Sequence, residues 1–144
     1  MQRIMKHRVV IAGMVALAAA GGYVAGVNAH EGGPLGIKPL YRTDLMGVEG
    51  KDVRMYELTF PPGAVSPDHI HPGNVFGYVI EGEIVNQFDD DAPVTHRAGQ
   101  VFYEKPGTRH VSSVNASKTD TARAVVFIVN TKGEADTIPV KNEE

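Results

Sequence analysis

The residues best suited to chemistry are three histidines, which lie in two stretches rich in glycine and proline. His69 and His71 are separated by one residue within residues 63–82, and His110 follows the turn Pro106-Gly107. In a β-strand, residues i and i+2 point to the same face, so the imidazoles of His69 and His71 can converge on one point. Neutral imidazole is a common ligand of divalent transition metals. The spacing therefore indicates a metal site at His69 and His71, with His110 as the candidate third ligand.

Three further polar residues are candidates for a catalytic role. Gln87 lies on the strand expected after Gly82 and could face the site together with Val85. Tyr103 and Glu104 are adjacent in the strand expected before the third histidine, so only one can point inward, and alternation does not say which. A glutamate at that place could act as a base. The alternative for all three is an ordinary solvent-facing or internally hydrogen-bonded side chain.

The elements that must position these residues are β-strands. Residues 51–60 alternate in character, with Tyr56, Leu58 and Phe60 on one face. Further short strands, separated by turn residues, are expected at 75–80, 84–88, 94–97, 101–104, 109–114 and 123–130, with 137–140 as a last edge strand. Punctuation of this kind without helical periodicity predicts a closed all-β sandwich or barrel.

Two motifs in this chain resemble those of the cupin superfamily. The first is Gly63-x5-His69-x-His71 followed by Gly82, and the second is Gly99 followed by Pro106-Gly107-x2-His110. Their order and separation, over roughly residues 54–130, make the resemblance specific. It implies an all-β fold with a single cupin jelly-roll barrel (a double-stranded β-helix) that binds a divalent metal near one mouth. It also implies that His69, His71 and His110 are the ligands and that the protein forms a homodimer.

One departure from the family pattern concerns the metal. The first motif of the family has a glutamate where this sequence has Val75, and neither Asn74 nor Phe76 replaces it. We therefore expect a three-histidine site that is one negative charge poorer than the family norm. Neutral nitrogen ligands suit Fe(II), Zn(II), Cu(II) and Ni(II), and suit Mn(II) less well. Fe(II) is the expected cofactor, with Zn, Mn, Ni and Cu as alternatives.

The resemblance implies two functions of different class. Three-histidine cupin sites resemble those of thiol, diketone-cleaving and ring-cleaving dioxygenases. One hypothesis is therefore a non-heme iron dioxygenase acting on a small chelating substrate, namely a thiol, a diketone or a hydroxy-aromatic compound. The other is a non-catalytic periplasmic module that binds a metal or a small ligand. Whether the protein is an enzyme stays open at this point.

The first 29 residues predict export. Arg3, Lys6 and Arg8 precede an apolar run over residues 9–27, which ends at Val27-Asn28-Ala29. This is the pattern of a signal peptide cleaved after residue 29, and an uncleaved N-terminal anchor is the alternative. Both place the folded part outside the cytoplasm, in the periplasm or secreted. After the leader we expect a flexible lead-in at 30–39, a cupin β-barrel at 40–140 and an acidic tail at 141–144.

The composition of the chain limits the classes of binding partner that are expected. The chain has 144 residues and no cysteine, which fits one domain and excludes disulfides, thiolate metal sites and thiol nucleophiles. Without the three basic residues of the leader, 11 Lys and Arg stand against 17 Asp and Glu, a formal net charge of −6. Nucleic acid is therefore not an expected partner. The expected partners are a small molecule and a second copy of the chain, which Phe76, Tyr78 and Ile80 would meet as an apolar outer face.

Overall fold

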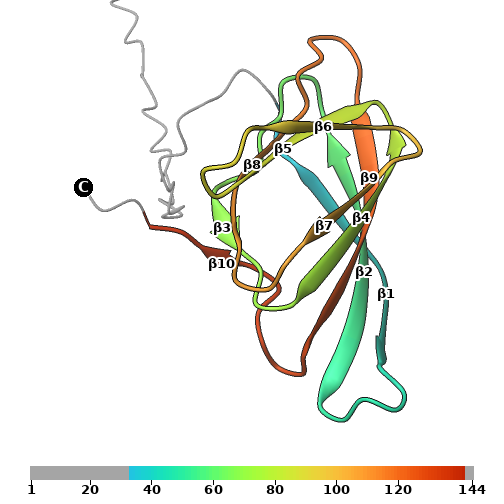
Figure 1. The fold of residues 1–144 in the computed structure, drawn as a ribbon. Helices are drawn as coiled ribbons and strands as arrows, with labels where there is room; N and C mark the ends of the chain where they lie inside the picture. Colours follow the sequence, from blue (N-terminus) through green and yellow to red (C-terminus); the bar gives the residue numbers. More distant parts are fainter. Residues whose placement is uncertain (1–32, 142–144) are drawn as a thin grey trace, which may run out of the picture.

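The computed structural model describes residues 33–141, and this part of the chain is all β, with two antiparallel five-stranded sheets (Figure 1). The first sheet has the order β1-β2-β9-β4-β7 and the second β10-β3-β8-β5-β6. The strands are β1 (Gly36–Asp44), β2 (Lys51–Phe60), β3 (His69–Ile70), β4 (Asn74–Glu81), β5 (Glu83–Phe88), β6 (Val94–Arg97), β7 (Val101–Glu104), β8 (Arg109–Val114), β9 (Ala122–Thr131) and β10 (Ile138–Pro139). The predicted all-β barrel is confirmed. Among the described residues, no helix is long and apolar enough to cross a membrane.

Strand β1 precedes the first strand that the sequence predicted, at residues 51–60. Residues 36–39, which we expected in a flexible lead-in, pair with β2 from Gly36 opposite Thr59 onward. All nine residues of β1 are exposed, so no inward-facing alternation marked the strand. Pro39 is tolerated because β1 is an edge strand, and the ladder shifts register just after it. The expected leader, and all of the acidic tail except residue 141, lie outside the described residues.

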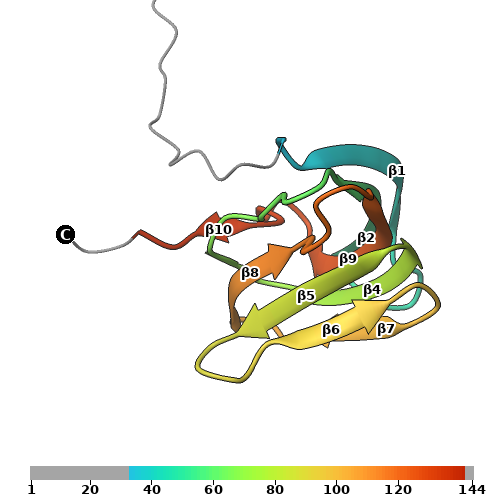
Figure 2. The same cartoon turned by 90° about the horizontal axis from the view of Figure 1, so that it is seen from above.

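The core lies between the two sheets, which Figure 2 shows as opposite walls. Strands β2 and β9 form a long antiparallel pair, and their even-numbered residues face inward. As predicted, Tyr56, Leu58 and Phe60 share this inner face. The fully buried apolar residues of the core are Phe60, Ala64, Val75, Val79, Ile84, Phe102, Ala122, Ala124, Val126 and Ile128.

Gly77 on β4 gives room for an aromatic ring rather than for a ligand. A Cβ atom at this position would lie 2.0 Å from Cζ of Phe102. Phe102 is 8% exposed and packs directly over the glycine backbone. The space left by the missing side chain at Gly77 is therefore filled by the Phe102 ring of the core.

Candidate metal centre

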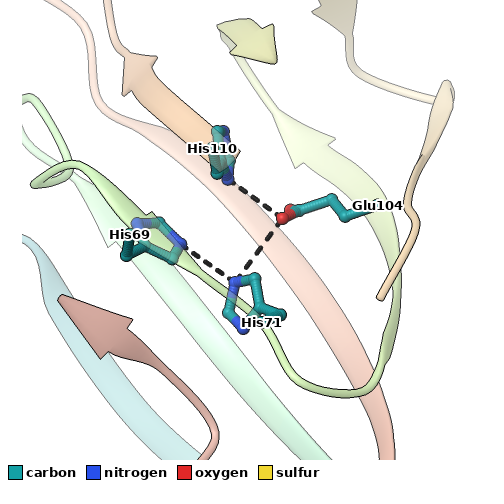
Figure 3. Close-up of side chains that lie close together, drawn as sticks. All are labelled: His69, His71, Glu104 and His110. Carbon is teal, nitrogen blue, oxygen red and sulfur yellow. Dashed lines mark hydrogen bonds and ion pairs between the residues drawn. The ribbon is translucent and has the colours of Figure 1, made fainter. Parts of the chain in front are cut away.

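The three histidines singled out by their spacing lie together inside the barrel, and Glu104 lies with them (Figure 3). One potential metal-ligating atom from each of the four side chains lies within 4.8 Å of the others. His69 on β3 is directly opposite His110 on β8 in the antiparallel pair, which places both rings at the same level. His71 follows directly after β3, and its ring is perpendicular to that of His69 at a centroid distance of 4.6 Å.

Glu104 corrects the expectation of a site without a carboxylate. The position of the family's glutamate is Val75, but Val75 on β4 pairs with Glu104 on β7, so a carboxylate reaches the histidines from the neighbouring strand. Glu104 is 5% exposed, and its Oε2 lies 3.0 Å from Nδ1 of His110 and 3.5 Å from Nε2 of His71. The site is therefore a cluster of three histidines and one glutamate, with the negative charge that we expected it to lack.

The hydrogen bonds behind the rings define which nitrogens face inward. Nδ1–H of His69 donates to the carbonyl of Pro67, and Nδ1–H of His71 donates to the carbonyl of Asp136, each at 2.6 Å. A ring nitrogen that donates to a carbonyl carries the proton, which leaves Nε2 of both rings as a lone-pair acceptor. Both lone pairs therefore point into the cluster.

His110 is held in the same way from the opposite side. Its Nε2–H donates to Oγ of Ser113 at 2.9 Å, and the Ser113 hydroxyl donates to Oδ1 of Asn86 at 2.6 Å. Asn86 and Ser113 are both buried. This chain leaves the lone pair on Nδ1 of His110, which faces the Glu104 carboxylate.

The four inward-facing atoms fit a divalent cation. The Nε2 atoms of His69 and His71 are 2.9 Å apart, and two lone pairs at this distance repel unless a proton or cation lies between them. Oε2 of Glu104 and Nδ1 of His110 are buried, and neither makes a hydrogen bond to the described part of the protein. Buried polar atoms without partners are costly, and one cation would satisfy all four. Burial and the neighbouring His71 and His110 lower the pKa of His69, which favours the neutral, ligating form.

Asn86 is a site residue that sequence reasoning missed. We expected Val85 and Gln87 to face inward, but the inward residues of β5 are Ile84 and Asn86. The Gln87 side chain instead donates to the carbonyl of Asp91 at 3.4 Å, away from the cluster. Asparagine is uncommon within strands, and its presence in the middle of β5 was the available signal.

Tyr103 is also remote from the cluster. Its side chain is 46% exposed, stacks on Phe76 at a centroid distance of 5.0 Å and donates to Oδ1 of Asn74 at 2.6 Å. It therefore belongs to the outer surface, as strand alternation requires once Glu104 faces inward. Of the three candidates for a catalytic role, only Glu104 lies at the site. Arg109, next to His110 in β8, points outward and pairs with Asp68.

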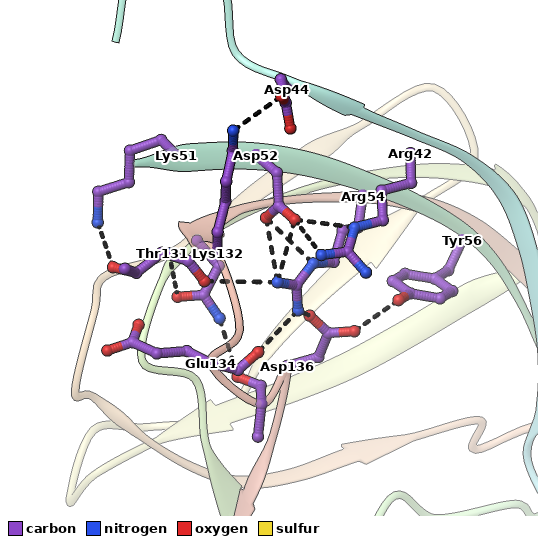
Figure 4. Close-up of polar contacts among 12 residues, drawn as sticks. Arg42, Asp44, Lys51, Asp52, Arg54, Tyr56, Thr131, Lys132, Glu134 and Asp136 are labelled. Carbon is purple, nitrogen blue, oxygen red and sulfur yellow. Dashed lines mark hydrogen bonds and ion pairs between the residues drawn. The ribbon is translucent and has the colours of Figure 1, made fainter. Parts of the chain in front are cut away.

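An ion network supports the segment that holds His71 (Figure 4). The carboxylate of Asp136 accepts hydrogen bonds from Nη1 of Arg54 and from the hydroxyl of Tyr56, each at 2.5 Å. Arg54 also donates to the carbonyl of Glu134 at 2.9 Å. These contacts tie residues 134–136 to β2, and the backbone carbonyl of Asp136 is the acceptor for His71. The network therefore reaches the metal centre through one backbone carbonyl.

The same network contains a buried aspartate with two arginine partners. Asp52 is 1% exposed and accepts hydrogen bonds from Arg42 at 2.8 Å and from Arg54 at 3.1 Å. Burial raises the pKa of Asp52, but the hydrogen bonds from both arginines outweigh burial and hold the pKa below its usual value. The carboxylate of Asp52 is therefore charged at neutral pH and balances the buried guanidinium of Arg54.

The four candidate ligands form part of the wall of a cavity of about 390 Å³. The remaining wall is largely apolar and is made by both sheets. Its apolar residues are Leu35, Ile37, Tyr56, Leu58, Phe60, Pro67, Val75, Ile84, Phe102, Val126, Ile128 and Pro139. Cavities of this size bind small organic molecules in many proteins. The arrangement places a candidate metal centre in contact with a space that a small molecule can occupy.

Comparison with known proteins agrees with this fold. Residues 56–128, just over half of the chain, match the cupin domain family. A structure of oxalate oxidase in complex with the substrate analogue glycolate is similar at 26% identity and a TM-score of 0.57, and the match covers 74% of this chain and 55% of that one. This chain thus spans about half the length of that oxidase. No curated protein gave a significant match.

Two further solved structures share the fold at lower identity. A cupin-like protein from Thermotoga maritima is 23% identical, with a TM-score of 0.54 and coverage of 65% of this chain and 67% of that one. A DMSP lyase from Ruegeria pomeroyi is 17% identical, with a TM-score of 0.52 and coverage of 60% of this chain and 42% of that one. The family match, the double-sheet barrel and the cluster of histidines and glutamate lead to one conclusion. The chain belongs to the cupin family.

Proposed function

We propose that this protein is a metal-dependent oxidoreductase, a dioxygenase whose small substrate chelates the metal. The observation that carries this proposal is the set of four donor atoms that face one another inside the barrel. Two of them, Oε2 of Glu104 and Nδ1 of His110, are buried without a hydrogen-bond partner in the described part of the chain, and the other two are the Nε2 atoms of His69 and His71, which face each other. The adjoining cavity of about 390 Å³ supplies the space for a substrate. The similarity to an oxidase in complex with a small substrate analogue adds support for oxidation chemistry on this fold.

His69, His71, His110 and Glu104 would hold the metal. Three imidazoles and one carboxylate suit Fe(II), which we propose, and the carboxylate removes our argument against Mn(II). When bound, such a metal supplies Lewis acidity and redox chemistry with dioxygen. Zn(II), Ni(II) and Cu(II) remain alternatives that the donor set accepts.

The other residues of the site orient these ligands and line the cavity beside them. The backbone carbonyls of Pro67 and Asp136 and the hydroxyl oxygen of Ser113 each accept a hydrogen bond from one histidine, which leaves the lone pair on its other ring nitrogen facing inward. The apolar wall, with Val75 next to Glu104 in the strand pairing, limits the polar contacts that water can make beside the donor atoms. The protein thus supplies an oriented donor set beside a largely apolar cavity.

Metal content is the first test. Elemental analysis of the purified protein should show close to one transition metal per chain, because a site with four preformed ligands retains its ion. Less than about a tenth of a metal per chain would contradict the proposal. Oxygen uptake by the iron-loaded protein should then be measured with thiols, diketones and hydroxybenzoates, and at least one of these classes should be consumed.

A non-catalytic binding module is the second candidate, and one observation favours it. Apart from the cluster, the acidic groups on the cavity wall are engaged: Asp136 with Arg54 and Tyr56, and Asp68 with Arg109. Neither is free to act as an acid or a base. Binding of small molecules by metal-loaded protein, without oxygen uptake for any class in the panel, would favour this module.

We also propose export, which rests on the sequence of residues 1–29. The mature protein should begin at His30, and N-terminal sequencing after cell fractionation checks this. Uncleaved protein in the membrane would favour the anchor, and uncleaved protein in the cytoplasm would contradict export.

We further propose a homodimer. The support is an apolar outer surface on β4 and β7, where Phe76, Tyr78 and Val101 are between 45% and 70% exposed. Sedimentation equilibrium should give twice the chain mass for the wild type and a lower association constant for Tyr78→Lys. A wild-type monomer at high concentration would contradict the proposal.

A further inference from the structure

The cavity wall identifies the class of ligand that the proposed metal centre takes. We propose that this ligand has one chelating end, which is neutral or singly charged, and an apolar body, and that small dianions such as oxalate are poor ligands. The inference rests on the proposed function, because the chelating end needs the metal. It goes beyond the proposed function by describing the part of the ligand that does not contact the metal.

The first support is the shape of the apolar wall. Val75, Ile84 and Phe102 line the same cavity as the four candidate ligands. Leu58 on β2 and Val126 and Ile128 on β9 extend this apolar lining. A polar body would lose its water against these side chains without gaining hydrogen bonds. An apolar body would gain about 25 cal/mol for each Å² that it buries.

The second support is the charge of the wall. Within residues 33–141, no lysine or arginine lines the cavity. Arg54 and Arg109 lie nearby, but each is paired with an aspartate of the lining. A second negative charge on a ligand would therefore find no cation besides the metal, and burying it unpaired is costly.

The third support is that polar groups lining the cavity are hydrogen-bonded to other groups of the protein. The hydroxyl of Tyr56 donates to Asp136, and that of Ser113 donates to Asn86. Oγ of Ser66 accepts from the backbone N–H of Ser113 at 2.8 Å. These groups position the protein's own side chains, so the metal is the main polar anchor for a ligand.

A pair of probes with the same chelating end tests this inference. Acetohydroxamate and benzohydroxamate both chelate through the hydroxamate group, but only benzohydroxamate carries an aromatic ring. Isothermal titration of the full-length, cobalt-loaded protein should give at least about thirtyfold tighter binding of benzohydroxamate, because the ring buries its apolar surface in the cavity. Oxalate should bind more weakly than either probe.

Two matched variants on β9 locate the apolar body. Val126 faces the cavity and Val125 faces the outside of the same strand, and Val→Thr places the same hydroxyl on opposite faces. Val126→Thr should weaken benzohydroxamate binding about three- to tenfold and leave acetohydroxamate binding unchanged. Val125→Thr should change neither and controls for the substitution itself, while unchanged acetohydroxamate binding by Val126→Thr shows that this variant is folded with its metal centre intact.

The outcomes separate the two proposals. Equal affinities for the two hydroxamates, or tightest binding of oxalate, would overturn the ligand class while leaving the metal centre intact. Equal effects of the Val125 and Val126 variants would also overturn it. Failure of the protein to retain cobalt would overturn the proposed function, and the ligand class with it.

Discussion

Replacing Asp136 with asparagine tests whether the ion network positions His71. The Asp136 carboxylate accepts two hydrogen bonds at 2.5 Å, one from the buried guanidinium of Arg54 and one from Tyr56. A hydrogen bond to a charged group contributes about 1.5–3 kcal/mol to stability. Arg54 keeps Asp52 as a partner, and an asparagine oxygen still accepts one bond. We therefore expect the free energy of unfolding to fall by about 2 kcal/mol.

The same substitution should weaken metal binding. The backbone carbonyl of Asp136 accepts a hydrogen bond from Nδ1–H of His71, and the network holds this carbonyl in place. Loss of a partner behind a ligand typically weakens metal affinity about 10- to 100-fold. Because the carbonyl itself remains in Asp136→Asn, we expect the low end of that range, about tenfold.

Two assays measure the two effects separately. Urea unfolding of the metal-free protein gives the stability, and competition with a chelator of known affinity gives the metal affinity. Asp44→Asn is the matched control, since Asp44 is paired with Lys132 at 2.7 Å but its side chain is 70% exposed. An exposed pair contributes about 0–1 kcal/mol, so the control should change little. A destabilised Asp136→Asn protein with unchanged metal affinity would refute the positioning of His71 by the network.

Three further predictions concern the ligand, the core and the acid response. Glu104→Gln should weaken metal binding at least about tenfold in the same competition assay, because it removes the one anionic ligand. Glu83→Gln, in an exposed pair with Arg97, is the control. Equal metal affinities of the two variants would contradict the role of Glu104. Gly77→Ala should lower the free energy of unfolding, measured in urea, by about 1–3 kcal/mol, because its Cβ would lie 2.0 Å from the Phe102 ring. An unchanged midpoint of urea unfolding would be inconsistent with this packing. The lowered pKa of Asp52 contributes stability above its unfolded value of 3.8, and this contribution is lost as pH falls through the folded value. Wild-type stability should therefore fall more steeply below about pH 4 than that of Asp52→Asn, and parallel pH profiles would argue against the aspartate's contribution.

The histidines of the site could be predicted from the sequence more readily than the glutamate, for a physical reason. The pair His69 and His71 is encoded locally, because residues two apart in an extended chain face the same way. Glu104 depends on which face of β7 turns inward and on the pairing of β7 with β4 at Val75. Strand pairing is a non-local property that spacing alone does not contain.

The strand predictions show the same division. The bounds of β2, β6, β7 and β8 follow from alternation and from turn residues, and they agree with the structure. Strand β1 was not among the strands predicted, and the barrel was expected only from residue 40, because the exposed side chains of β1 show no inward face. Gln87 was considered as an inward-facing residue of β5, but Asn86 faces inward. Alternation gives two possible faces but does not say which one turns inward, because that depends on the pairing with other strands.

The central claim is that His69, His71, His110 and Glu104 together hold one metal ion. Anomalous diffraction from crystals of the metal-loaded protein, collected at the absorption edge of the metal, tests it most directly. We predict a single strong peak within about 2.0–2.3 Å of one atom from each of the four side chains. A peak elsewhere, or a peak without Glu104 among its ligands, would contradict the account.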